Sequence, residues 1–162
     1  MRIVVLLMAM SAGALAGGDP PTHEDCVDCT LETDFLWPPN HNLVDVGLQI
    51  NGIADPTITV YSDEDDVWPA SAQFSPDAKL DCKGLRLRSE RGGPGDGRVY
   101  LIVVQGDHEC VLTVVVPHDL SSASIASVFA QADAARDYFI ANGVPPPGFF
   151  LVGDGPVIGP KQ

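Results

Sequence analysis

Between residues 84 and 119, apolar positions recur with the spacing of β-strands. Leu85 and Leu87 fall on one face of an extended chain, and Arg86 and Arg88 fall on the other. A period of two is typical of a half-buried strand. Residues 84–89 are therefore expected to form the first of three successive strands.

The next two strands are expected at residues 99–104 and 111–116, which are almost unbroken apolar and β-branched runs. Runs of this kind are typical of strands that are covered on both faces. Pro117 has no backbone N–H and ends the last strand. The glycine-rich segment 92–97 and residues 106–109 are expected to form the turns of a β-meander.

Two further strands and one helix complete the expected elements. Residues 44–50 alternate between apolar and polar, and residues 57–61 are rich in β-branched side chains. Residues 121–143 place Ile125, Phe129 and Phe139 at helical spacing, with a serine cap at the start and Asn-Gly at the end. The fold class expected is mostly β, an antiparallel β-sandwich with one appended C-terminal α-helix.

The chain divides into five parts. Residues 1–16 have a basic start, an apolar run and a small-residue cleavage site, which are the features of a cleaved signal peptide. Residues 17–35 form a cysteine-bearing arm, 36–120 the sandwich, 121–143 an amphipathic helix and 144–162 a Pro/Gly-rich tail. The apolar run at the start is too short for a permanent membrane span, so no transmembrane segment is expected.

The formal net charge is −13 at pH 7, and loss of Arg2 with the signal peptide makes it one unit more negative. Nucleic acid is therefore excluded as an expected partner, because a phosphate backbone requires a basic surface. An acidic surface is compatible with hard-cation binding, and equally with simple solvation.

All four cysteines follow the signal peptide, and an even number in an exported chain favours disulfides. The preferred pairing joins Cys82 to Cys110 and Cys26 to Cys29, and the crossed pairings remain open. The C-x-x-C spelling of Cys26 and Cys29 lies in an acidic, loop-like segment, where no helix N-terminus would activate a thiol.

Four short motifs occur in a specific order: W-P-P-N-H at 37–41, R-S-E-R at 88–91, G-R-V-Y at 97–100 and V-P-H-D at 116–119. This order resembles an Ig-like β-sandwich module of bacterial exported proteins, found beside hyalin-repeat (HYR) and cadherin-like domains. The resemblance implies an Ig-like sandwich and an extracellular, non-catalytic role in binding or adhesion. The chain departs from that pattern after Asp107, where the module's turn has a glycine that this sequence lacks.

Calcium is the candidate cofactor, because it prefers oxygen ligands gathered from loops. Acidic residues at a strand end, in the next hairpin and after the last strand are similar to cadherin-like calcium sites. The alternative is that these carboxylates lie apart on a solvated surface, with Glu90 paired to a neighbouring arginine. The candidate ligands are Asp63, Glu64, Asp65, Asp66, Glu90, Asp107 and Asp119.

An enzyme is not expected. His41, His108 and His118 could form a metal or general-base site only if they converged. The sequence has neither an H-E-x-x-H nor a G-x-S-x-G motif. A small metal-dependent hydrolase is therefore the least favoured alternative.

The expected function is an exported, non-catalytic binding or structural module of the adhesion type. It would be secreted or act at the cell surface, with the periplasm as a further location, and its partner would be a protein or a cell-surface or matrix component. The alternative is a module that docks on a protein partner through its C-terminal helix and tail.

Overall fold

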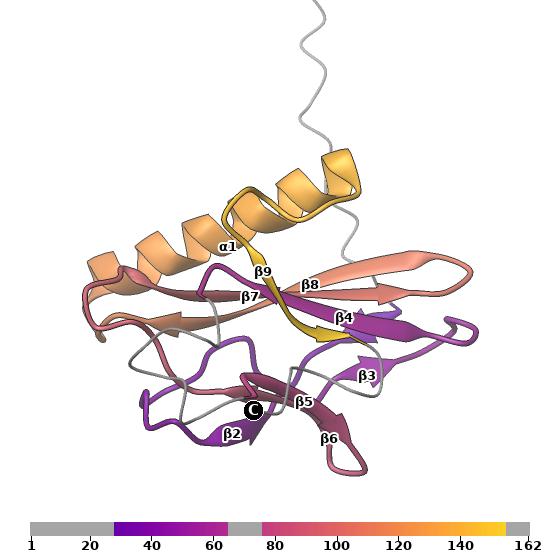
Figure 1. The fold of residues 1–162 in the computed structure, drawn as a ribbon, viewed down its shortest axis with the longest axis horizontal. Coiled ribbons are helices and arrows are strands. Elements are labelled where there is room, and N and C mark those ends of the chain that lie inside the picture. The colour runs from indigo at the N-terminus through magenta and orange to yellow at the C-terminus, as the bar shows by residue number, and fades with distance from the viewer. Residues whose placement is uncertain (1–27, 65–75, 155–162) are drawn as a thin grey trace, which may run out of the picture.

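The computed structural model describes residues 28–64 and 76–154, which form an antiparallel β-sandwich with one C-terminal helix. In Figure 1 the helix lies on one face of a four-stranded sheet, and the smaller sheets lie against the opposite face. The elements are β1 (Cys29–Thr30), β2 (Leu43–Asp45), β3 (Gln49–Ile50), β4 (Thr57–Ser62), β5 (Ala78–Asp81), β6 (Gly84–Arg88), β7 (Gly97–Gln105), β8 (Glu109–Pro117), α1 (Ser122–Asn142) and β9 (Phe150–Asp154).

The four-stranded sheet has the order β8-β7-β4-β9, with every neighbour antiparallel. Its longest pairing is the β7–β8 hairpin, whose register runs from Gly97 opposite Pro117 to Gln105 opposite Glu109, and β8 forms one edge of the sheet. The β-branched runs of the two strands suit a pleated surface, where branched side chains pack without losing further rotamer freedom.

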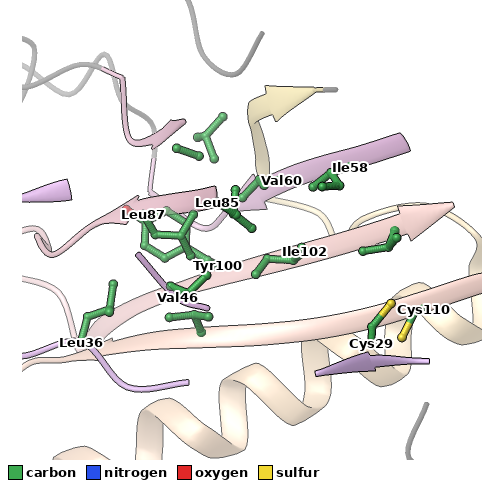
Figure 2. Packing of buried hydrophobic residues seen from close by; sticks show 14 of the residues in the cluster. Cys29, Leu36, Val46, Ile58, Val60, Leu85, Leu87, Tyr100, Ile102 and Cys110 are labelled. Atoms are coloured by element: carbon green, nitrogen blue, oxygen red, sulfur yellow. The ribbon is translucent and has the colours of Figure 1, made fainter. Parts of the chain in front are cut away.

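Strand β7 is buried on both faces, as its unbroken apolar run predicts. Tyr100 and Ile102 point toward the smaller sheet, where they join the core with Leu85 and Leu87 of β6 (Figure 2). The alternate residues Val99, Leu101 and Val103 face the other way and pack under α1.

Helix α1 has the two caps that the sequence predicts. Ser121 is extended, and its hydroxyl oxygen accepts a hydrogen bond from the Ser124 N–H at 3.2 Å. Gly143 adopts a left-handed conformation, and its N–H donates to the carbonyl of Phe139. The helix therefore begins and ends where local hydrogen bonds satisfy its terminal groups.

The helix is docked through a stripe of small and large apolar residues, Val128, Ala132, Ala135 and Phe139. The expected anchors Ile125 and Phe129 are only partly buried. The two alanines have small side chains and allow the helix axis to approach the sheet closely, so the helix face that contains them is the one that is buried. Phe129 instead stacks on Phe35 of the N-terminal arm, with ring centroids 6.4 Å apart.

The predicted meander is wrong in one respect. Strand β6 does not pair with β7 but lies between β2 and β5 in a separate three-stranded sheet. The segment 92–97 therefore crosses between the two sheets instead of forming a hairpin turn. Alternation shows which side chains of a strand are buried, but both a hairpin neighbour and a facing sheet can bury them.

The strand expected at 44–50 is interrupted at Gly47, which separates β2 from β3. Gly47 has φ of 62°, and a Cβ there would lie 2.3 Å from a side-chain carbon of Glu32. Only glycine accommodates both the backbone angle and this close approach.

Segments outside the expected sandwich boundaries also contribute strands. Within the described part of the arm, β1 pairs with β3, and Phe35 forms an isolated parallel bridge to Val115 of β8. Within the described part of the tail, β9 pairs with β4 and forms one edge of the four-stranded sheet. The described residues contain no helix that is both long enough and apolar enough to cross a membrane.

We predict that Phe139→Ala lowers the free energy of unfolding by about 3 kcal/mol, because it removes a buried aromatic ring between α1 and the sheet. Urea denaturation measures the change. Tyr138→Ala is the matched control, because the neighbouring ring is 38% exposed, and it should cost less than about 1 kcal/mol. Equal losses in the two variants would show that α1 is not docked through this stripe.

Candidate functional site

A buried ionic cluster occupies one end of the sandwich, and Arg98 is its centre. Arg98 lies on the same face of β7 as Tyr100, so the strand directs its side chain into the core, where it is 1% exposed. Its guanidinium carbon lies 4.6 Å from the centre of the Tyr100 ring. A charge buried this deeply is tolerated only if it is paired and hydrogen-bonded.

Four groups surround the guanidinium. Its Nη2 pairs with the fully buried carboxylate of Asp77 and donates to the Glu64 carbonyl at 2.9 Å. Its Nε donates to the Ser62 hydroxyl at 2.9 Å, and its Nη1 lies 3.4 Å from Oε1 of Glu90. The carboxylates of Asp77 and Glu90 thus pair with the arginine. Each ion pair is stronger here than it would be in water, because the buried surroundings screen the charges less.

Glu90 connects the cluster to the surface. Its Oε2 lies 2.7 Å from Nδ1 of His41, whose side chain is 44% exposed, whereas that of Glu90 is 3% exposed. Burial raises the pKa of Glu90, and the hydrogen bond from His41 opposes that rise. Glu90 thus lies between the buried Arg98 and the partly exposed His41.

Asp63 and Glu64 hold the chain that leaves β4. Oδ1 of Asp63 accepts from the Val99 N–H at 2.9 Å, and the Glu64 carboxylate accepts from the Gly92 N–H at 2.7 and 2.8 Å. Burial raises the pKa of Asp63 to about 6 and also raises the pKa of Glu64. Through these hydrogen bonds the two carboxylates fix the end of β4 to the backbone at Val99 and Gly92.

Arg88 and Ser89 tie two more loops to this end of the sandwich. Arg88 donates to the carbonyls of His41 and Pro76, each at 2.6 Å, and the Ser89 hydroxyl donates to the Pro38 carbonyl at 2.7 Å. The Tyr100 hydroxyl donates to the Arg88 carbonyl at 2.8 Å, and burial raises its pKa. The motifs at 37–41, 88–91 and 97–100 thus meet in one network of side-chain and backbone contacts.

The predicted calcium ligands do not form one site among the described residues. Asp63, Glu64 and Glu90 gather around Arg98, whereas Asp107 lies beyond the other end of β7. Because a strand rises about 3.3 Å per residue, the nine-residue β7 separates these two ends by more than 20 Å. Asp65 and Asp66 lie outside the described residues.

Asp107 and Asp119 each have local partners. Asp107 accepts from the Ala54 N–H at 3.0 Å, which lowers its pKa. Asp119 accepts from the Ser121 N–H at 2.7 Å at the start of α1, and its pKa is lowered as well. Within residues 28–64 and 76–154, no group of three or more His, Cys, Asp or Glu side chains is arranged to hold a metal ion.

The three histidines expected to converge in the hydrolase alternative lie apart. His41 contacts Glu90, whereas His108 lies 2.9 Å from Asp28 at the opposite end of β7. His118 follows β8, next to Asp119. The structure therefore provides no three-histidine site in the part of the chain that it describes.

The predicted bond between Cys82 and Cys110 is not present. Cys82 is exposed in the turn between β5 and β6, whereas Cys110 is buried at the start of β8. The prediction assumed that β6 was the neighbour of β7, and β6 instead belongs to the other sheet. Cys26 lies outside the described residues, and Cys29 is buried in β1.

A groove of about 380 Å³ lies between the N-terminal arm and the β8 edge, and the sequence pattern did not reveal it. Its walls come from three elements distant in sequence, so only the folded chain assembles it. Its lining is mixed, with polar, charged and apolar side chains, and the residues are Thr30, Leu31, Glu32, Thr33, Asp34, Leu112, Thr113 and Arg136.

Comparison of the chain with protein-family models, with curated protein sequences and with solved structures finds no match. The role of the ionic cluster is therefore argued from its geometry. Every described carboxylate in it accepts from an arginine, a histidine or a backbone N–H, which is the arrangement of a cluster that stabilises loops.

We predict that Arg98→Met lowers the free energy of unfolding by about 3–5 kcal/mol, because it removes the guanidinium that lies between the buried carboxylates of Asp77 and Glu90 and leaves Asp77 with only the longer contact to Arg88. Chemical denaturation measures the loss. Arg136→Met is the control, since Arg136 pairs with an exposed Asp133 and should cost less than about 1 kcal/mol. A loss for Arg98→Met as small as the control would contradict the central role of Arg98.

Asp63 predicts a pH dependence with a definite sign. Its folded-state pKa of about 6 exceeds the ordinary value of 3.8 for an aspartate, so the folded state binds a proton more tightly than the unfolded state. This stabilisation is complete below pH 4 and is lost as pH rises through 6. Asp63→Asn keeps the acceptor for the Val99 N–H and removes the charge, so it should stabilise the protein by about 2 kcal/mol at pH 7.5.

The measurement is urea unfolding of both proteins from pH 4 to pH 8. The advantage of Asp63→Asn should shrink toward zero at the acidic end. Asp107→Asn is the control of opposite sign, because the lowered pKa of Asp107 stabilises the fold above pH 4. A destabilised Asp63→Asn at pH 7.5 would contradict the assignment.

Proposed function

We propose that the chain is an exported, non-catalytic binding or structural module with an Ig-like sandwich, acting at the cell surface or outside the cell. Its partner would be a protein or a matrix component. The signal-peptide pattern of residues 1–16 and the acidic composition support export and a partner other than nucleic acid. The stabilising character of the Arg98 cluster supports a role that needs a rigid scaffold.

The observation that carries the proposal is a run of exposed apolar side chains along the C-terminal part of the described chain. Seven large hydrophobic residues are exposed in the described part of the chain, and five of them lie between residues 138 and 151. This segment comprises the end of α1 and the start of β9. The five residues are Tyr138, Ile140, Val144, Phe150 and Leu151.

Strand β9 adds a second property that suits binding. It is the last strand of its sheet, so within the described residues its outer side has no strand neighbour. An edge strand offers a row of backbone N–H and C=O groups to an incoming strand, and flanking apolar side chains supply specificity. Phe150 is 46% exposed and Leu151 is 54% exposed beside this row.

Docking through the apolar stripe of α1 is not supported, because Val128, Ala132, Ala135 and Phe139 are buried against the module's own sheet. The part of that alternative that places binding in the C-terminal tail is kept, with β9 as the binding strand. Calcium stabilisation stays a prediction. Asp63, Glu64 and Glu90 already have protein partners, which makes these three carboxylates less suited to bind an ion.

The test is retention of the fluorescently labelled full chain on intact cells of the source organism. We expect the double variant Phe150→Asp/Leu151→Asp to reduce retention at least tenfold, because two charges would enter the apolar contact. Leu120→Asp is the matched control, since Leu120 is 56% exposed beyond the opposite end of α1 and should leave retention unchanged.

Circular dichroism and thermal melting of the three proteins establish that each is folded. Loss of retention in the double variant alone supports binding through the β9 edge. Equal retention of all three folded proteins, or no retention of the wild type, contradicts the proposal.

A further inference from the structure

Cys29 and Cys110 meet in the core, although they lie at distant points of the sequence. Cys29 is 2% exposed and Cys110 is 1% exposed, and both belong to the principal hydrophobic cluster. Strand β1, which contains Cys29, contacts β8, which contains Cys110. Figure 2 shows the two side chains directed toward each other, with their sulfur ends between the two strands.

The setting of Cys29 indicates what a covalent link would stabilise. Strand β1 has only two residues, and its only strand pairing in the described structure is with the equally short β3. Nearby, the Asn51 N–H donates to the Asp28 carbonyl at 2.6 Å, and His108 lies 2.9 Å from the Asp28 carboxylate. Short pairings of this kind open easily, because few hydrogen bonds oppose the chain entropy that is regained.

Cys110 has the opposite setting. It lies near the start of β8, opposite Val104 and close to the turn of the long β7–β8 hairpin in the four-stranded sheet. A bond from Cys29 to Cys110 would therefore join the weakly held arm to the most extensively paired part of the fold. Cys82 differs from both, because it is exposed in a turn of the other sheet.

We propose that Cys29 and Cys110 form a disulfide that joins β1 to β8 in the mature, exported chain. The oxidant is a small-molecule or protein disulfide. One cysteine thiolate attacks its S–S bond and releases one thiol, and the second cysteine thiolate then displaces the other thiol from the mixed disulfide. Two cysteine thiols are oxidised to one disulfide, and the two protons and two electrons pass to the oxidant as two thiols.

Such a bond would constrain the unfolded chain across most of the sandwich, from residue 29 to residue 110. Closure of a long loop is the case in which a disulfide is expected to stabilise most. The proposed bond does not depend on which partner the module binds, so its failure and the failure of the binding proposal can be distinguished.

The decisive experiment is peptide mapping of the full chain, refolded with reduced and oxidised glutathione. Free thiols are blocked with N-ethylmaleimide in denaturant, and the protein is cut without reduction by a protease that cleaves before aspartate. Cleavage before Asp28 separates Cys26 from Cys29, and cleavage before Asp81 and Asp107 gives Cys82 and Cys110 peptides of their own. Each possible pairing therefore has its own mass.

We expect the peptide of residues 28–33 to be linked to the peptide of residues 107–118. A link from Cys110 to the peptide of residues 81–95, or a link between residues 25–27 and 28–33, would overturn the proposal. Blocked thiols at Cys29 and Cys110 would overturn it as well.

Thermal melting tests whether the bond stabilises the fold. Dithiothreitol should lower the Tm of the wild type by about 10 °C, and Cys82→Ser should show the same drop. The double variant Cys29→Ala/Cys110→Ala should melt at a Tm that dithiothreitol hardly changes. A wild-type Tm that is indifferent to dithiothreitol would overturn the stabilising role.

Discussion

The buried charge of Arg98 is the constraint on which the arrangement of this module depends. Arg98 is the second residue of β7, and its buried guanidinium must be neutralised inside the protein. Asp77 and Glu90 neutralise it from two different segments. Ser62 and the Glu64 carbonyl complete its hydrogen bonds. Three other segments of the chain, at residues 62–64, 77 and 90, are thereby held to β7 by a single side chain.

The rest of the fold follows from the two covered faces of β7. Its inner face builds the core with β6, and its outer face receives α1 (Figures 1 and 2). The helix and the smaller sheet pack on different side chains of β7, because alternate residues of a strand point to opposite faces. This three-layer arrangement leaves β9 as an edge strand with Phe150 and Leu151 exposed, and leaves β1 as a short element with few hydrogen bonds.

The chemistry of the site is explained by how its carboxylates are satisfied. The sequence predicts Asp63, Glu64 and Glu90 as calcium ligands, because acidic loop residues are suited to a hard cation. In the folded protein they accept hydrogen bonds from Val99, Gly92 and His41. An arginine and backbone N–H groups thus supply the positive charge that an ion would otherwise provide.

The sequence by itself determined the elements whose signals are local. The caps at Ser121 and Gly143, and the doubly buried run of β7, depend only on residues close together in the chain. The partner of β6, the meeting of Asp77 with Arg98 and the approach of Cys29 to Cys110 were decided by the tertiary structure. Alternation specifies which side chains are buried, but the free energy of burial is the same whichever neighbour covers them, so only the packed fold selects the contacts.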